Sequence, residues 1–181
     1  MPSPAMPPLP RLVLRLSEGG RRQSLPVLLE PDAVGRAAVA AELGIPAVRK
    51  LRLEGRLVPE GRQDWRLEAS LGATVVQDCV VTLAPVVTRI DEELERCYLA
   101  GLPEPEGGEH EMGDEDVEPL PAALDLGEVM LEALALALPP FPRADGAELG
   151  EVVATAPGAE PLTEERARPF AGLGDALKKG E

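Results

Sequence analysis

The fold is decided by residues 51–71, which read LRLEGRLVPEGRQDWRLEASL. Leu51, Leu53 and Leu57 alternate with charged residues, and after a polar turn at residues 59–63 the alternation resumes at Trp65. Alternation with a period of two is typical of a strand that buries one face. Two such runs joined by a short turn predict an antiparallel hairpin.

The segments on either side of this hairpin predict further strands. Residues 75–83 are richer in apolar and β-branched side chains, which predicts a strand buried on both faces. The first half of residues 86–98 also predicts a strand, whereas its acidic second half gives no clear pattern. Towards the N-terminus, alternation at residues 12–17 and an apolar run at residues 25–29 predict a hairpin or two neighbouring strands.

Two helices are predicted from their ends. Asp32 can cap a helix that stops near Gly44, and Asp125 can cap a second helix that Pro139 terminates. The second helix carries a continuous apolar stripe, which needs a surface to cover, and the predicted sheet is the available one. The expected fold class is therefore α+β, with a mainly antiparallel, partly barrel-like sheet, two packed helices and disordered tails.

The domain organisation follows from the distribution of Pro, Gly and acidic residues. We expect a single α+β domain over residues 11–142, interrupted by an acidic linker at residues 103–121. A disordered, Pro-rich lead at residues 1–10 would precede it. A flexible tail at residues 143–181, with a short terminal amphipathic segment, would follow it.

The formal net charge of −14 is spread unevenly. Residues 1–66 are net positive, and residues 67–181 are strongly net negative. Since an acidic surface is repelled by phosphate, contact with nucleic acid would need a local patch on the N-terminal half. Otherwise the partner is a basic protein.

The candidate patch consists of Arg49, Lys50, Arg52 and Arg56 on the predicted hairpin. Alternation places the last three on the face opposite the buried leucines. Ordinary solvated strand residues would give the same pattern, so this is one of two interpretations. The patch lacks aromatic side chains for stacking on bases, so contact with the RNA backbone would have to dominate.

Catalytic and metal-binding patterns are sparse. The single histidine, His110, lies in the acidic linker, which leaves no credible base for a Ser–His or Cys–His arrangement, and there is no glycine-rich phosphate loop. The residue three positions after Cys79 is Thr82, so the Cys-x-x-Cys spacing of a zinc knuckle is missing. We expect no enzymatic activity, no cofactor, no metal and no small-molecule substrate, and we interpret Cys79 as a small buried residue.

The sequence shows neither an export signal nor a membrane-spanning stretch. The N-terminus does not read as a secretion signal, and the longest apolar stretch, at residues 129–142, is too short to span a bilayer. We expect a soluble cytoplasmic protein with no membrane partner.

An ordered set of motifs runs through the chain. It comprises Leu67-Glu68-Ala69, residues 75–85 with Gln77, Cys79, Thr82, Leu83 and Pro85, then Leu124-Asp125-Leu126-Gly127-Glu128, Leu134–Pro139 and the closing Pro169-Phe170-Ala171. This set resembles the YceD family of large-subunit ribosomal RNA accumulation proteins and is most similar to its alphaproteobacterial members. Many members of the family carry Cys-x-x-Cys-Leu where this chain has Thr82, so no metal or redox role is carried over.

The resemblance implies a non-enzymatic role in ribosome biogenesis. The protein would support accumulation of large-subunit ribosomal RNA and ribosome assembly by binding that RNA or basic ribosomal proteins. The alternative is a protein–protein adaptor that makes no contact with RNA.

Overall fold

The computed structural model describes residues 8–16, 23–101 and 117–148. The elements within these ranges are β1 (Val13–Arg15), β2 (Leu25–Leu29), α1 (Ala33–Glu42), β3 (Ala47–Glu60), β4 (Asp64–Asp78), β5 (Pro85–Leu99), β6 (Val117–Pro119), β7 (Ala123–Asp125) and α2 (Leu126–Ala137). Most of the predicted lead, most of the predicted linker and the tail from residue 149 lie outside the described residues. None of the described helices is long and apolar enough to cross a membrane.

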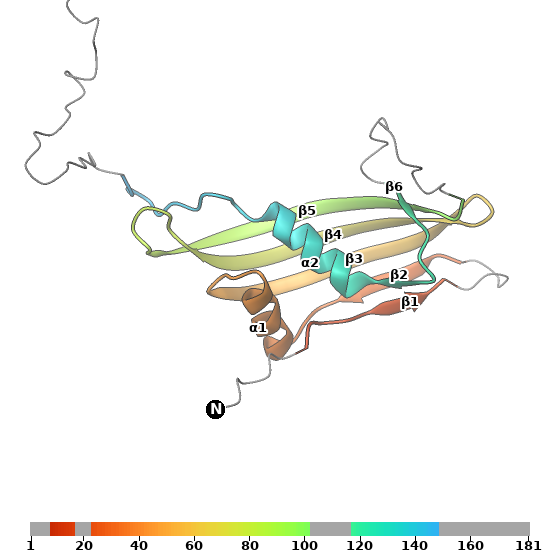
Figure 1. The fold of residues 1–181 in the computed structure, drawn as a ribbon, viewed down its shortest axis with the longest axis horizontal. Helices are drawn as coiled ribbons and strands as arrows, with labels where there is room; N and C mark the ends of the chain where they lie inside the picture. Colours follow the sequence, from red (N-terminus) through yellow and green to blue (C-terminus); the bar gives the residue numbers. More distant parts are fainter. Residues whose placement is uncertain (1–7, 17–22, 102–116, 149–181) are drawn as a thin grey trace, which may run out of the picture. The chain divides into compact units, whose positions relative to one another are not determined.

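The larger sheet has the strand order β2-β3-β4-β5-β6 (Figure 1). β2 to β5 are antiparallel neighbours, and β6 runs parallel to the end of β5. The predicted hairpin is confirmed as β3 and β4, which pair from Glu60 opposite Asp64 back to Ala47 opposite Val76. Both strands are longer than the pattern predicted, because pairing continues through Gly72 and the apolar residues that follow it.

The α+β class, with two helices packed on a mainly antiparallel sheet, is confirmed, and the described strands form no closed barrel. Within the described residues the sheet is open, with β2 at one end and β6 at the other. β6 lies inside the range predicted as a linker and was not expected, because its three residues carry no apolar alternation.

The prediction that the first two strands are neighbours is wrong. β1 pairs with β7 in a separate two-stranded sheet, and β2 pairs with β3. Leu14 lies opposite Leu124, and both belong to the hydrophobic core. The free energy gained by burying these leucines beside α2 outweighs the lower entropic cost of a local hairpin between β1 and β2, which are joined by a short connection.

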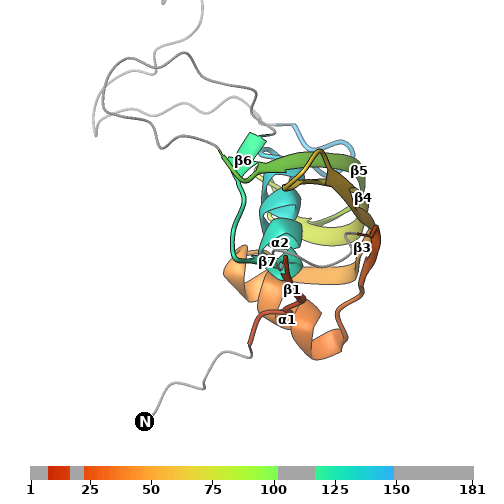
Figure 2. The ribbon, with the colours of Figure 1, turned by 90° about the vertical axis from the view of Figure 1, so that its right-hand side faces the viewer.

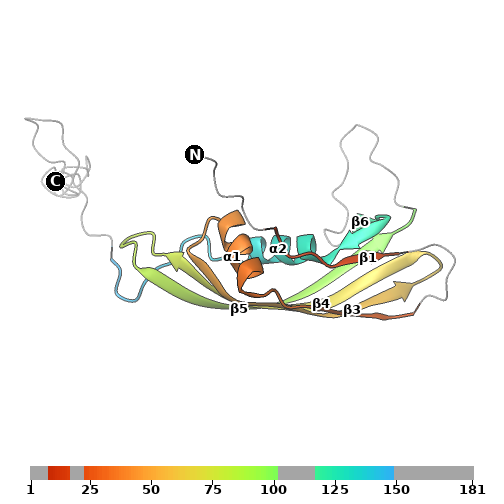
Figure 3. The ribbon, with the colours of Figure 1, turned by 90° about the horizontal axis from the view of Figure 1, so that it is seen from below.

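Both helices lie on the same face of the larger sheet, as Figure 3 shows. Asp32 caps α1 by accepting a hydrogen bond from the Gly35 N–H at 2.8 Å, and Asp125 caps α2 by accepting one from the Gly127 N–H at 3.0 Å. Both predicted caps are therefore confirmed. The end-on view in Figure 2 shows α2 beneath the layer of long strands. The core between them contains Leu53, Leu67, Leu71, Met130 and Leu134, all almost fully buried.

Asp125 also ties the N-terminal segment to α2. Its carboxylate accepts hydrogen bonds from the Arg11 side chain at 2.7 Å and from the Leu12 N–H at 3.2 Å. Burial disfavours the charged carboxylate, but these donors and the Gly127 N–H outweigh it, so the pKa of Asp125 is lowered. Gly127 permits this close approach, since a Cβ there would lie 2.1 Å from the Pro10 carbonyl oxygen.

The strand predicted to reach residue 83 ends at Asp78. The prediction of burial on both faces is confirmed for residues 75–77, but the last five residues form a turn. The turn is closed by hydrogen bonds from the Leu83 N–H to the Cys79 carbonyl and from the Cys79 N–H to the Ala84 carbonyl. β5 then runs unbroken through the acidic segment, because β4 pairs with it along its whole length and the acidic side chains stay exposed.

Candidate RNA and partner interface

The predicted basic residues lie on the face of the sheet that the helices leave uncovered. Lys50, Arg52 and Arg56 are exposed on β3, whereas Leu51, Leu53 and Leu57 are buried on the opposite face. The alternation predicted for this strand is therefore confirmed. The uncovered face of the sheet is called the outer face below.

A bulge in β3 brings Arg49 to the same side. The register with β4 shifts between Val48 and Lys50, so that Arg49 has no opposite residue. A bulge inserts one extra residue and re-aims the side chains around it. As a result Arg49 and Lys50 are consecutive and both exposed.

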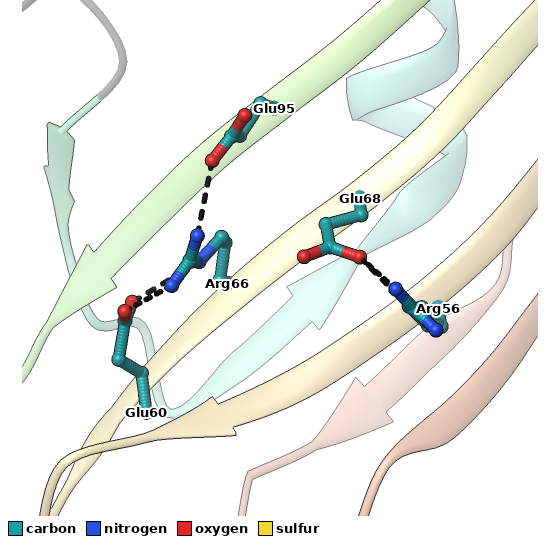
Figure 4. A network of polar contacts seen from close by, with 5 residues as sticks. All are labelled: Arg56, Glu60, Arg66, Glu68 and Glu95. Atoms are coloured by element: carbon teal, nitrogen blue, oxygen red, sulfur yellow. Dashed lines mark hydrogen bonds and ion pairs between the residues drawn. The ribbon is translucent and has the colours of Figure 1, made fainter.

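Two of the four predicted residues are paired with carboxylates. Arg52 forms an ion pair with Glu54 at 2.7 Å, two positions along the same strand. Arg56 forms one at 2.7 Å with Glu68, which lies directly opposite on β4 (Figure 4). The predicted strip is therefore not continuously positive. No such ion pair involves Arg49 or Lys50 within the described part of the chain.

The same neutralisation recurs on the neighbouring strands. Arg66 on β4 lies between Glu60 and Glu95, and its ion pairs with both are seen in Figure 4. The hydrogen bond and charge of Glu60 raise the pKa of Arg66 above its ordinary value. On β5, Arg89 bonds to Asp91 through its Nε at 2.8 Å. These exposed pairs each add little to stability, but together they cancel most of the positive charge of the outer face.

The unpaired charge is concentrated at one end of the outer face. A shallow depression of about 720 Å³ lies there, and Arg36, Arg49 and Lys50 contribute to its lining. We call these three residues the basic corner. Arg36 comes from α1, and its guanidinium donates a hydrogen bond to the Pro31 carbonyl at 2.7 Å. Sequence reasoning missed Arg36, because nothing local in the sequence shows that the first turn of α1 lies near the β3 bulge. Five carboxylates also line the depression: Glu30, Glu54, Asp91, Glu92 and Glu93.

The sequence motif around residues 77–85 lies beyond the same end of these strands, at the β4–β5 turn, since Ala47 at the start of β3 is opposite Val76. Gln77 lies near the end of β4, Pro85 begins β5, and Cys79, Thr82 and Leu83 form the turn between them. Leu83 has a φ of 60°, a left-handed conformation that is costly for a branched side chain. The turn is therefore held in a specific shape by its surroundings.

Those surroundings are the segment that follows α2. The Gln77 side-chain amide donates to the Pro139 carbonyl at 3.1 Å, and the Val80 N–H donates to the Pro142 carbonyl at 2.9 Å. The Ala144 N–H in turn donates to the Cys79 sulfur at 3.3 Å. The motif after β4 and the motif that ends α2 thus form one contact, which fixes the end of the helix to the sheet.

Cys79 is the centre of this contact. Its side chain is fully buried, and its sulfur also accepts hydrogen bonds from the Val81 and Thr82 N–H groups at 3.4 Å. The Thr82 side chain, followed by the backbone donors, lowers the pKa of the Cys79 thiol to about 6, although burial opposes this. The expected buried position is confirmed, but the sulfur acts as a hydrogen-bond acceptor as well as an apolar group. Among the described residues, no group of three or more His, Cys, Asp and Glu side chains is arranged to hold a metal ion.

Comparison with known proteins supports the resemblance seen in the motifs. The family model described as "Large ribosomal RNA subunit accumulation protein YceD" matches residues 67–177, and the chain belongs to this family. No curated protein and no solved structure matches the chain. The matched range contains β4 almost entirely, the β4–β5 turn, β5 and α2, whereas residues 49–56 precede it.

Proposed function

We propose that this member of the YceD family is a non-enzymatic factor that supports large-subunit ribosomal RNA accumulation and ribosome assembly by binding. The family match carries the proposal, because the family is described by accumulation of the large ribosomal RNA subunit. Two features support binding over catalysis. The Cys79 thiol is fully buried, and the charged side chains of the outer face are largely paired with one another.

The basic corner is the proposed point of contact with RNA. Phosphate groups are attracted by Lys and Arg side chains whose charge is not already neutralised. Arg49 and Lys50 meet that condition within the described residues, whereas Arg52 and Arg56 hold carboxylates at 2.7 Å. The contact is small, so it would position RNA through its backbone without reading its sequence.

A protein–protein adaptor without RNA contact is the second candidate. The pairing of Arg52 and Arg56 with Glu54 and Glu68 favours it, because it reduces the positive strip to one corner. The two candidates differ in what charge reversal at the basic corner would do.

Binding of large-subunit ribosomal RNA by purified variants distinguishes them. The Arg49→Glu/Lys50→Glu variant should bind more weakly, and the slope of log affinity against log salt should fall by about 1.4 to 1.8, since two phosphate contacts are lost. The matched control is Arg15→Glu/Arg62→Glu, which changes the net charge equally at exposed residues away from the corner. Equal loss in both variants would show a non-specific charge effect, and no RNA binding by the unaltered protein would favour the adaptor.

Deletion of the gene tests the role itself. Large-subunit ribosomal RNA should decrease relative to small-subunit RNA, and sucrose gradients should show a deficit of large subunits. The unaltered gene should restore both, and the Arg15→Glu/Arg62→Glu gene should do the same. Unchanged amounts of large-subunit RNA after deletion would contradict the proposed function for either mode of binding.

A further inference from the structure

One edge of the larger sheet is open along most of a long strand. β5 pairs with β4 from Pro85 to Tyr98, but on its other side it pairs with β6 only at residues 97–99. Within the described ranges, no strand lies against that side of residues 86–96. Alternate backbone N–H and C=O groups of an edge strand point away from the sheet and can pair with another extended chain.

A groove accompanies this edge. It has a volume of about 300 Å³ and lies between β5 and α2, lined by Leu94, Ala133, Leu136 and Ala137 together with charged residues of β5. Leu136 is 78% exposed although it belongs to a helix packed against the core. An apolar side chain standing beside an unpaired strand edge offers a contact for alternate side chains of an added strand.

The charge of the edge is negative on both sides. Glu92 lies on the face that carries the helices, and Glu93 lies on the outer face, so the two carboxylates flank the edge. Neither forms an ion pair with another described residue. Glu95 also lines the groove. Arg96, the basic residue in the groove lining, forms ion pairs with Glu118 and Glu132 at 2.9 Å, so its positive charge is neutralised.

From the open edge, the groove with its exposed Leu136 and the negative charge of Glu92 and Glu93, we infer that β5 is a docking site for a basic protein segment in extended conformation. The segment adds to the sheet as a strand beside residues 86–96. Its backbone pairs with β5, and its apolar side chains contact Leu136 and Leu94 on the face that carries the helices. Its Lys or Arg side chains then lie on the outer face nearest Glu93, and Glu92 attracts them from the other side of the edge. Nucleic acid is disfavoured at this site by the same carboxylates. Glu92 and Glu93 also line the depression of the basic corner, so the two surfaces adjoin. The inference nevertheless holds whether or not that corner contacts RNA, because it rests on the open strand edge of β5.

The competing explanation is that the glutamates only protect the edge. Charged side chains on edge strands prevent unwanted pairing with other chains. That explanation accounts for the carboxylates, but it does not account for an exposed leucine beside a groove. It also predicts that no extended segment, basic or acidic, pairs with β5.

The probe for the test is a fluorescein-labelled peptide of about ten alternating Lys and Val residues, long enough to cover the open edge at about 3.3 Å per residue. Fluorescence anisotropy with the full-length protein should show binding that weakens as salt is raised. In hydrogen exchange, the peptide should protect alternate backbone amides of residues 86–96. A peptide with N-methyl groups on alternate residues keeps the charge but cannot pair along one edge, and it should not protect them.

Two variants keep the test specific. Glu92→Lys/Glu93→Lys should weaken peptide binding by roughly tenfold or more, since two attractive charges become repulsive. The control Glu30→Lys/Glu42→Lys changes the charge equally at exposed residues elsewhere and should bind nearly as the unaltered protein does. Leu136→Lys should weaken binding several-fold, and the control Val34→Lys, at an exposed position of α1, should not.

Three outcomes would overturn the inference. They are no binding of the Lys–Val peptide, equal binding by the Glu92→Lys/Glu93→Lys variant and its control, and binding without protection of β5. The last outcome would show adsorption by charge alone. None of them would affect the RNA measurements at the basic corner, so failure here is distinguishable from failure of the proposed function.

Discussion

At the scale of single residues, Cys79 is the most informative position. Its sulfur accepts N–H groups from its own turn and from Ala144, in the segment after α2. Such donors stabilise a thiolate more than a thiol. The residue therefore links folding to pH through a group that no solvent molecule reaches directly, because its side chain is fully buried.

The pKa of Cys79 is about 6 in the folded protein. In the unfolded chain a Cys thiol has a pKa of about 8.5. A lowered folded pKa gives stability that is fully present above the unfolded value and lost as the pH falls through the folded one. The free energy of unfolding should therefore rise between about pH 6 and pH 8.5, and Cys79→Ala should remove that rise.

Urea unfolding followed by the fluorescence of Trp65, the single tryptophan, measures this at several pH values across the window. Cys97→Ala, which removes the other thiol, should keep the wild-type dependence. The same pH dependence in Cys79→Ala and the unaltered protein would contradict the role given to the Cys79 sulfur.

At the scale of elements, the long β3–β4 hairpin depends on one close approach. Gly55 lies opposite Ala69, and a Cβ on Gly55 would lie 2.1 Å from the Glu68 carbonyl oxygen. The neighbour is backbone, so it cannot move aside as a flexible side chain can. Figure 3 shows the long strands curving beneath the helices, and a residue without a side chain allows the two backbones to come this near.

Replacement of Gly55 by Ala should therefore destabilise the protein by about 3 kcal/mol, at the upper end of the usual cost of overpacking. The measurement is chemical unfolding of the purified variant. Gly101→Ala is the matched control, because a Cβ at Gly101 would have no atom within 4 Å. That control should change the free energy of unfolding by less than about 0.5 kcal/mol. A Gly55→Ala variant as stable as the control would show that the two strands separate easily.

At the scale of the whole molecule, most of the positive charge on the outer face is neutralised by neighbouring carboxylates. The outer face contains many arginines, but most are paired with glutamates or aspartates on the same or neighbouring strands. Arg49 and Lys50 at the basic corner form no ion pair among the described residues, and the acidic β5 edge with Glu92 and Glu93 adjoins that corner. A chain with a net charge of −14 can in this way present a local positive site.

If pairing limits RNA contact, removing the paired carboxylates should extend the positive site. The Glu54→Gln/Glu68→Gln variant frees Arg52 and Arg56, and its RNA affinity should rise several-fold with a salt slope steeper by up to about 1.5. Glu42→Gln/Glu128→Gln removes the same charge from exposed carboxylates that do not line the depression, and it should give a clearly smaller gain. Equal gains in the two variants would mean that only net charge matters, and no change in either would favour the adaptor.

The sequence predicts the local features of this structure well. Asp32 and Asp125 mark the starts of both helices, and the alternation around Leu53 and Leu67 identifies the hairpin. Features that depend on residues far apart in the chain were missed. Alternation at residues 12–17 predicts the strand β1, but β7 has three residues, too few for a pattern, and the pairing of the two is decided by burial beside α2.

The candidate interface also has some features that follow from local sequence and others that depend on contacts between distant segments. Exposure of Lys50, Arg52 and Arg56 follows from alternation alone, but their neutralisation depends on register. A turn centred near residue 62 would have placed Arg56 opposite Glu68, so this pair had a signal in the sequence. The approach of Arg36 to the basic corner, and the contact of Ala144 with Cys79, had no such signal because they join different elements.

The pairing of β1 with β7 has a consequence for how the chain folds as it is synthesised. Val13 lies opposite Asp125, more than a hundred residues later. At a synthesis rate of about 5–20 residues per second, β1 waits roughly 5–20 s for its partner to be made. The β3–β4 hairpin, with a turn of only a few residues, can form during that wait. Closure of β1 onto β7, with the Arg11–Asp125 bond, is thus a late step that can begin only once α2 is being made.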